Sequence, residues 1–211
     1  MPRTIAIGDI HGCAVALSRL LQEVAPQKSD TIVGIGDYVD RGLDSNGVIE
    51  ILIGLVSECH LVPLIGNHEL MMFTGLRNRQ DFDFWVHHGG SQTLASYGGK
   101  TENIPQHHMT FLSHCLKFYE TDSHLFVHAN YVPEIPLEQQ PDQIIFWEHV
   151  TDQVPQPRQI HPLRQPERLP RRSCRCDVFH RMACEIPIEE WMFDRAGADG
   201  IVKEKRRSTS P

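Results

Sequence analysis

The chain has 211 residues, of which 40% are hydrophobic and 22% are charged, and its formal net charge is -7 at pH 7. That length fits one domain, or one domain with a tail, and the composition is ordinary for a globular protein. The acidic balance favours neither nucleic acid nor an anionic membrane as a general partner, so neither is expected, and no stretch approaches the roughly 20 apolar residues that a membrane-spanning helix needs.

The first third of the chain repeats strand, polar loop and helix three times. Strands are expected at residues 4–7, 31–35 and 60–65, and helices at 14–24, 46–58 and 68–76. Short β-branched and apolar runs that end at a glycine predict buried strands, and leucines and valines at helical spacing predict the helices. A fourth strand is expected at 125–127. This order predicts a sheet covered by helices.

Polar residues gather where the predicted strands end. The clusters are Gly8-Asp9-Ile10-His11-Gly12, Gly36-Asp37-Tyr38-Val39-Asp40-Arg41-Gly42, Gly66-Asn67-His68-Glu69 and Val127-His128-Ala129-Asn130. Ligands of open α/β sheets bind at the edge where the strands end, so clusters far apart in the sequence can converge there. Carboxylates, imidazoles and a side-chain amide suit borderline divalent ions such as manganese, iron or zinc. The sequence therefore predicts a metal site.

In this order the motifs GDxHG, GDxxDRG and GNHE, followed by a histidine after a later strand, resemble the calcineurin-like metallophosphoesterases. Within that family the chain is similar to the phosphoprotein phosphatase type of bacteria and phages over residues 4–150. Further residues that resemble the inserted helical segment of this subgroup are Trp85, Gly89, Gly90, Thr93, Ser96, Tyr97 and Gly98. The resemblance implies an α/β fold, a metallophosphatase-type β-sandwich flanked by helices, with incomplete C-terminal strands.

The resemblance also implies a set of metal ligands. Asp9 and His11 are expected to hold a first ion, Asp37 to bridge both ions, and Asn67 and His128 to hold a second. Manganese is the expected metal at both positions, with iron and zinc as alternatives. A pair of such ions can clamp a phosphate and acidify a water molecule.

The remaining roles belong to catalysis and substrate binding. His68 is expected to protonate the leaving alkoxide while Asp40 holds its ring, and Arg41 to contact a phosphate oxygen through its planar fork. His149 falls where related enzymes carry a second phosphate-binding residue. The implied reaction is hydrolysis of phosphomonoesters by a metal-bridging hydroxide, with protein phosphoserine and phosphothreonine, or a small phosphoester, as substrates.

Two other functions remain open from the sequence. Symmetrical dinucleoside tetraphosphate hydrolases look similar in these motifs. A catalytically impaired protein that only binds metal or phosphate is the other alternative, because the chain contains no Gly-His-Thr motif, which brings the family's last metal-ligand histidine. His180 has the better sequence context as a substitute for that histidine, and His161 is the second choice.

The C-terminal part of the chain differs from the rest. Residues 1–154 are predicted to form the metallophosphoesterase core, and 155–211 an atypical segment rich in proline and arginine, irregular over 155–172. One hypothesis is that residues near 155–195 are an out-of-frame remainder of the same domain, because a shifted frame allows Leu163 to Cys174 to encode a Ser-Gly start and a Gly-His end. In that case the second metal binds weakly.

Other residues are expected to play no part in the site. The pairs His87-His88 and His107-His108 are predicted to be exposed loop residues, and Phe146 and Trp147 to be core residues in a strand-like run. The six cysteines are scattered and are expected to be free thiols. With no signal-peptide pattern at its start, the chain is expected to be cytoplasmic, and a monomer is the expected state.

Overall fold

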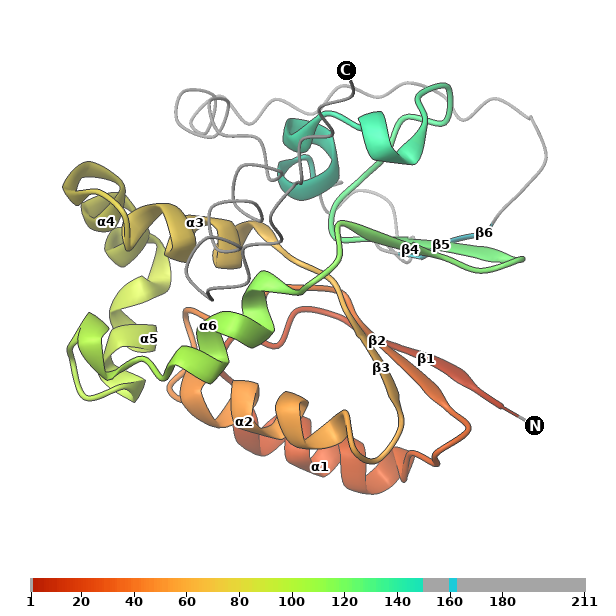
Figure 1. Ribbon diagram of the computed structural model, residues 1–211, viewed down its shortest axis with the longest axis horizontal. Helices are drawn as coiled ribbons and strands as arrows, with labels where there is room; N and C mark the ends of the chain where they lie inside the picture. Colours follow the sequence, from red (N-terminus) through yellow and green to blue (C-terminus); the bar gives the residue numbers. More distant parts are fainter. Residues whose placement is uncertain (1, 150–159, 163–211) are drawn as a thin grey trace, which may run out of the picture. The chain divides into compact units, whose positions relative to one another are not determined.

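The computed structural model describes residues 2–149 and 160–162 (Figure 1). Its strands are β1 Thr4–Ile7, β2 Thr31–Gly34, β3 His60–Pro63, β4 Phe118–Glu120, β5 His124–Val127 and β6 Ile160–Pro162. Its α-helices are α1 Ala14–Val24, α2 Ser45–Leu55, α3 Asn67–Gly75, α4 Arg79–Trp85, α5 Ser91–Ser96 and α6 Gln106–Ser113. Shorter helical turns are η1 Val86–Gly90, η2 Thr101–Asn103, η3 Leu137–Gln139 and η4 Gln143–Trp147.

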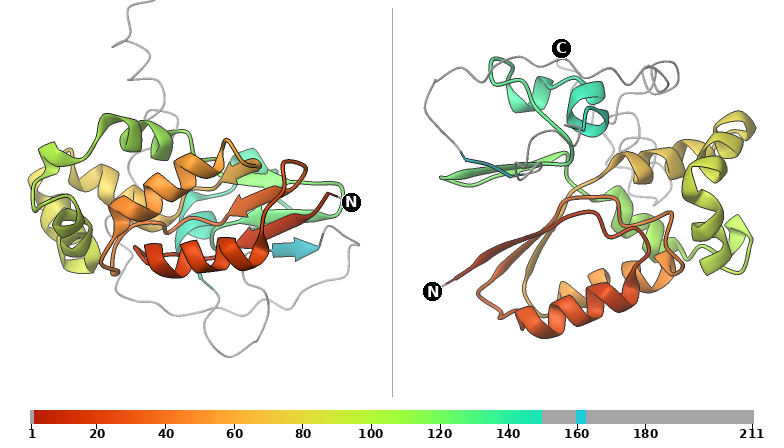
Figure 2. Two further views of the ribbon diagram at one scale, coloured as in Figure 1. Left: turned by 90° about the horizontal axis from the view of Figure 1, so that it is seen from below. Right: turned by 180° about the vertical axis from the view of Figure 1, so that it is seen from behind.

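The first sheet is parallel, with the order β1-β2-β3. Helices α1 and α2 connect its strands and lie on one side of it in both Figure 1 and Figure 2. The three predicted strand-loop-helix repeats are confirmed, and α1 has the predicted bounds. β3 ends two residues earlier than predicted. Leu64 then forms an isolated parallel bridge with Leu116, and Ile65 donates its N–H to the carbonyl of Leu116.

The second sheet is antiparallel, with the order β4-β5-β6. It packs against the first sheet through a shared core of Val33, Ile35, Val62, Leu64 and Phe126. The two sheets with their flanking helices are the predicted α/β sandwich. The prediction of an irregular tract over 155–172 is wrong at 160–162, because these residues pair with β5 as strand β6.

Helix α2 shows how local sequence positions these elements. Asp44 caps its N-terminus by accepting a hydrogen bond from the N–H of Gly47 at 2.8 Å. One face of the helix is buried through Val48, Ile49, Leu52 and Leu55. Among the described residues, no helix combines the length and the apolar character that crossing a bilayer requires.

The segment after β5 folds back onto the loop that carries His128. Ile145 accepts a hydrogen bond from the N–H of Ala129 at 2.9 Å, and Ile144 accepts one from Asn130. Phe146 is buried, which confirms its predicted place in the core, whereas Trp147 is only half-buried. The strand predicted here is wrong, since the residues form the helical turn η4.

The two histidine pairs lie in helical turns, so the prediction of loops is wrong for both. His87 is exposed and His88 half-buried in η1, and in α6 His107 is exposed whereas His108 is fully buried. Burial of His108 is possible because both its ring nitrogens have partners. Nε2 lies 2.8 Å from a carboxylate oxygen of Glu50, and Nδ1 lies 2.8 Å from the Tyr97 hydroxyl.

The pKa of His108 is lowered, because burial outweighs the hydrogen bond to Glu50. A neutral ring with its proton on Nε2 donates to Glu50 and accepts from Tyr97, which satisfies every polar atom of the ring. His107 approaches the same carboxylate oxygen, at 3.1 Å. The Glu50, His107 and His108 cluster therefore has a complete structural explanation: it ties α6 to α2.

Replacing His108 with phenylalanine is expected to lower the free energy of unfolding by about 1–3 kcal/mol, because the buried Tyr97 hydroxyl loses its partner. Urea unfolding followed by circular dichroism measures the change. The matched control is His107→Ala, which removes an exposed ring from the same carboxylate and should change stability by less than about 0.5 kcal/mol. Equal effects of the two substitutions would contradict the structural role of His108.

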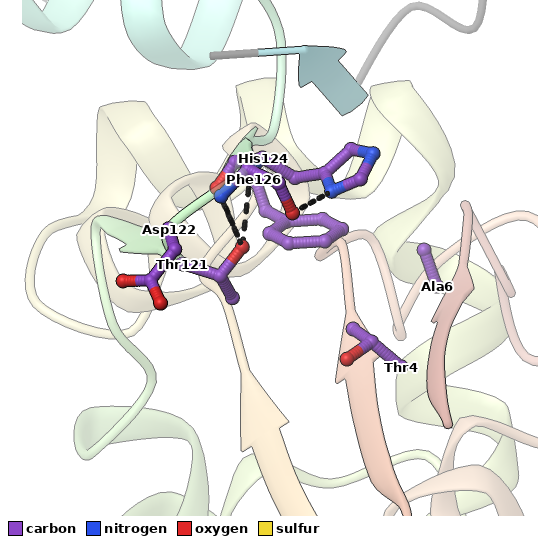
Figure 3. Close-up of a pocket in the computed structure, with 7 residues that line it drawn as sticks. Thr4, Ala6, Thr121, Asp122, His124 and Phe126 are labelled. Carbon is purple, nitrogen blue, oxygen red and sulfur yellow. Dashed lines mark hydrogen bonds between the residues drawn. The ribbon is translucent and has the colours of Figure 1, made fainter. Parts of the chain in front are cut away.

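A cavity of about 410 Å³ opens between the start of β1 and the turn that joins β4 to β5 (Figure 3). Its lining residues are Thr4, Ala6, Thr121, Asp122, Ser123, His124 and Phe126. They include none of the residues in the predicted metal motifs. Those motifs follow the C-terminal ends of the strands, whereas this cavity lies near the N-terminal ends of β1 and β5, so it is not the predicted site.

Candidate metal centre

The loops after β1 and β2 are bound directly to each other. The N–H groups of Ile10 and His11 both donate to the carbonyl of Asp37, at 3.0 and 2.8 Å, and Gly12 donates to Tyr38. Gly42 completes the contact, because a Cβ atom at that position would run into the carbonyl oxygen of His11. The first two motifs thus form one folded unit, and their glycines permit the close approach.

Backbone strain is concentrated in this unit. Four non-glycine residues of the two motifs have a positive φ: His11 at 45°, Asp37 at 53°, Asp40 at 71° and Arg41 at 64°. Such conformations cost on the order of 1–3 kcal/mol each and persist only where surrounding contacts enforce them. Strain of this kind is typical of functional sites.

Glu69 supplies many of the contacts that enforce this backbone, and no role was predicted for it. Its carboxylate is fully buried and faces four backbone N–H groups: Asp37 and Gly66 at 2.9 Å each, Tyr38 at 2.8 Å and Val39 at 3.2 Å. Only the ionised carboxylate accepts from all four. Its position as the last residue of the GNHE motif was the available signal, because an acidic residue at the third position of a helix often accepts from the preceding backbone.

Burial, followed by the charge of Asp37, raises the pKa of Glu69 to about 7, while the hydrogen bonds from Gly66 and Val39 oppose the rise. Glu69→Gln is expected to lower the free energy of unfolding by at least about 2 kcal/mol, since an amide nitrogen would face N–H donors. Urea unfolding tests this, with the exposed Glu23→Gln on α1 as the control. A Glu69→Gln chain as stable as the control would show that the carboxylate is dispensable.

Asp37 lies between two histidines. One of its carboxylate oxygens is 3.6 Å from Nε2 of His11, and the other is 3.5 Å from Nε2 of His128. Asp37 is almost completely buried, as is His128. Burial opposes ionisation of Asp37, but the nearby rings of His128, His68 and His11 outweigh it and lower its pKa. A charged carboxylate that points one oxygen at each imidazole has the form of a bridging ligand between two cations.

Both histidines are oriented for metal binding. Nδ1 of His11 lies 2.9 Å from the carbonyl of Val39, and Nδ1 of His128 lies 2.7 Å from the carbonyl of Ile35. A carbonyl can only accept, so each Nδ1 carries a proton, and Nε2, which points toward Asp37, is the ring nitrogen left for a cation. Burial lowers the pKa of His11 despite its bond to Val39, which favours the neutral, ligating form.

The other predicted ligands differ in how the structure places them. Asn67 directs its amide oxygen to within 2.9 Å of Nε2 of His128, so these two predicted ligands lie side by side. Asp9 is exposed at the end of β1 and does not belong to any group of converging metal-ligand atoms among the described residues. His180 lies outside those residues, and only the backbone of His161 is described, in β6.

The proposed proton donor and its partner lie beside these ligands. His68 is buried, and its Nδ1 is 2.8 Å from a carboxylate oxygen of Asp40. Trp85 donates its indole N–H to Asp40 at 3.0 Å, and the Thr93 hydroxyl donates to it at 2.7 Å. Trp85 and Thr93, which belong to the inserted helical segment, thus hold Asp40 in place by hydrogen bonds. Asp40 in turn holds the ring of His68.

Burial opposes protonation of His68, but the hydrogen bond to Asp40 and the charges of Asp37 and Asp40 outweigh it, so its pKa is raised. Its Nε2 is the ring nitrogen left to act on a substrate. Arg41 is exposed, and its Nη1 lies 3.0 Å from Nε2 of His11, at the first half of the centre. The ring of His68 and the guanidinium of Arg41 therefore lie beside His11 and Asp37.

A comparison with known families decides what this arrangement belongs to. The family model of the calcineurin-like phosphoesterases matches residues 2–192. The chain belongs to this family. The family resemblance expected from the motifs and the α/β fold are thereby confirmed, and the converging histidines and aspartates agree with a family of metal-dependent enzymes.

Named relatives fall into two groups. Serine/threonine-protein phosphatase 1 of Salmonella typhimurium is 37% identical over 40% of this chain and 37% of its own length. A symmetrical bis(5'-nucleosyl)-tetraphosphatase of Janthinobacterium is 32% identical over 62% of this chain and 44% of its own. The chain spans less than half the length of these relatives.

One solved structure is similar in fold and sequence. It is provisionally described as a diadenosine tetraphosphatase, and it matches with a TM-score of 0.50 and 29% identity over 67% of this chain and 57% of that protein. Relatives of both kinds are therefore similar to this chain, and the family alone does not select a substrate.

Proposed function

We propose that the chain is a metal-dependent phosphoesterase that hydrolyses phosphomonoesters, with protein phosphoserine and phosphothreonine as substrates. The observation that supports this best is the position of Asp37, whose two oxygens face His11 and His128 separately, beside the His68 and Asp40 pair. Two-cation binding, a proton donor and a cationic side chain are what hydrolysis of a phosphate ester needs.

His11 and Asp37 would hold the first cation, with Asp9 joining them if its exposed carboxylate turns inward. Asp37, Asn67 and His128 would hold the second. When bound, a pair of divalent ions supplies Lewis acidity that activates water and neutralises phosphate charge. Manganese is the ion we propose, because the mixture of carboxylate, amide and imidazole donors accepts it.

The chain's own residues supply positioning and proton transfer. Arg41 would bind a phosphate oxygen with its planar fork, drawing the phosphate toward the first half of the centre. His68 would give the proton on Nε2 to the leaving oxygen, while Asp40 holds the ring in place through Nδ1. The hydrogen bonds from Trp85 and Thr93 keep Asp40 from moving away.

The test is hydrolysis of phosphoserine and phosphothreonine peptides by the purified chain with manganese, followed by release of inorganic phosphate. We expect turnover that is abolished by a chelator and restored by adding manganese. If the chain binds two ions but releases no phosphate from any peptide or from a chromogenic phosphate ester, the proposal fails, and a non-catalytic binding role replaces it.

A second function has specific support. The Janthinobacterium relative and the solved structure both carry names of dinucleoside tetraphosphatases. Diadenosine tetraphosphate should therefore be assayed beside the phosphopeptides at equal concentration. A kcat/KM for diadenosine tetraphosphate at least about tenfold above that of every peptide, with ADP as the product, would favour this second function over the first.

A further inference from the structure

His149 lies against the second half of the metal centre. Its ring centroid is 4.9 Å from that of His128, and the two rings meet edge to face at 76°. One ligand atom each from Asp37, His128 and His149 lie within 4.8 Å of one another. The structure therefore places His149 beside the residues that face a second cation.

The backbone fixes this position. His149 follows the turn η4, and its N–H donates to the carbonyl of Trp147 at 2.9 Å. The same turn is bonded to the chain just after His128, through Ala129 and the fully buried Ile145. His128 and His149 thus belong to segments that are held together by backbone hydrogen bonds.

Without His149, the second cation would have three protein donors: Asp37, Asn67 and His128. Borderline divalent ions take four or more ligands, and an imidazole nitrogen is among those they prefer. The 211 residues contain no Gly-His-Thr motif to provide a further histidine. A histidine that is already converged on Asp37 and His128 meets this requirement.

We propose that His149 is a protein ligand of the second cation, in place of the histidine of the Gly-His-Thr motif. The inference rests on the proposed function, because it uses the same pair of cations. It also changes the role expected for His149 from its sequence position, where it was a candidate phosphate-binding residue. A metal ligand affects ion affinity without substrate, whereas a phosphate-binding residue affects the KM for substrate.

The first experiment measures metal binding without substrate. The metal-free chain and His149→Ala are titrated with manganese by calorimetry, and bound ions are counted by elemental analysis. We expect two ions in the parent chain, and in His149→Ala a second ion bound about 10- to 100-fold more weakly. His124→Ala, an exposed histidine at the other end of β5, is the matched control and should bind both ions normally.

The second experiment uses His149→Cys loaded with cobalt. A thiolate bound to cobalt adds a charge-transfer band in the near ultraviolet, so the band appears only if residue 149 is a ligand. His124→Cys should lack it. Unchanged affinity for both ions in His149→Ala overturns the inference even if the enzyme turns over normally.

The proposed hydrolysis and the proposed ligand role of His149 can be refuted separately. Loss of the second ion in His149→Ala, with no phosphate released by the parent chain, supports the ligand and refutes the proposed reaction. Normal ion binding with a raised KM in His149→Ala refutes the ligand, supports a phosphate contact and leaves the reaction intact. A parent chain that binds less than one ion overturns both.

Discussion

Asp37→Asn is expected to lower turnover by at least about 1,000-fold and to lower metal content below two ions per chain. The two oxygens of Asp37 face Nε2 of His11 and Nε2 of His128 at 3.6 and 3.5 Å. Asparagine preserves the size of the side chain but has one oxygen and no charge, so it cannot serve both positions. Bound ions supply several kcal/mol of transition-state stabilisation, and about 1.4 kcal/mol corresponds to a tenfold change in rate.

The control for this substitution is Asp44→Asn. Asp44 is an exposed aspartate that caps α2, and asparagine is an equally good capping residue. Metal content by elemental analysis and phosphate release with manganese should both be unchanged in that variant. An Asp37→Asn chain that still holds two ions and works within about tenfold of the parent would remove Asp37 from the centre.

The sequence predicted the first sheet and most of the site because the two depend on local signals. Each of the first three strands is a short apolar run that ends at a glycine-containing polar motif, and the motifs of a parallel sheet meet at one edge. The resemblance of these motifs to a known family implied Asp37, Asn67 and His128 as ligands, and the structure brings them together with His11.

Contacts between distant segments were not predictable in this way. His108 can be buried because Glu50, 58 positions earlier in the chain, accepts a hydrogen bond from its Nε2, and nothing near His108 in the sequence indicates such a partner. Strand β6 is a similar case, since it is defined by pairing with β5 within a proline- and arginine-rich tract. The predictions of irregular structure at His108 and at residues 160–162 were wrong because contacts between distant segments determine the structure there.

The support around the site was predicted only in part. Trp85 and Thr93 were identified by resemblance, but their hydrogen bonds to Asp40 depend on how the inserted helices pack. The full role of Glu69 could not be predicted from its motif, because four backbone N–H groups converge on it only in the folded loops. The side chains that bind ligands can be predicted from a motif, whereas those that hold a strained backbone require the structure.

His68→Asn is expected to slow hydrolysis of a phosphoserine peptide by about 100- to 10,000-fold, the contribution of a general acid. Asparagine can still donate a hydrogen bond to Asp40 but has no proton to give to the leaving oxygen. The serine alkoxide is a poor leaving group and needs that proton, whereas nitrophenolate leaves without it. The loss on p-nitrophenyl phosphate should therefore be much smaller, and comparison of kcat for the two substrates is the measurement.

The metal content of His68→Asn distinguishes the general-acid role of His68 from a second role that the geometry allows, that of a metal ligand. Ligand atoms of His68, His11 and Asp37 lie within 4.8 Å of one another, so His68 could instead be a metal ligand. In that case His68→Asn would lose an ion and would slow both substrates equally. As a general acid, it should keep both ions.

The pH dependence of kcat in Asp40→Asn tests whether the Asp40 carboxylate controls the proton on His68. His68 acts as an acid only while protonated, so kcat falls as the pH rises through its pKa. Burial opposes protonation of His68, but the bond to Asp40 and the nearby carboxylate charges raise its pKa. Removing the charge of Asp40 should lower that pKa, so the falling limb of kcat for the phosphoserine peptide should move to lower pH, with the largest loss at alkaline pH. A limb that stays in place, or moves to higher pH, would show that the Asp40 carboxylate does not control the proton on His68.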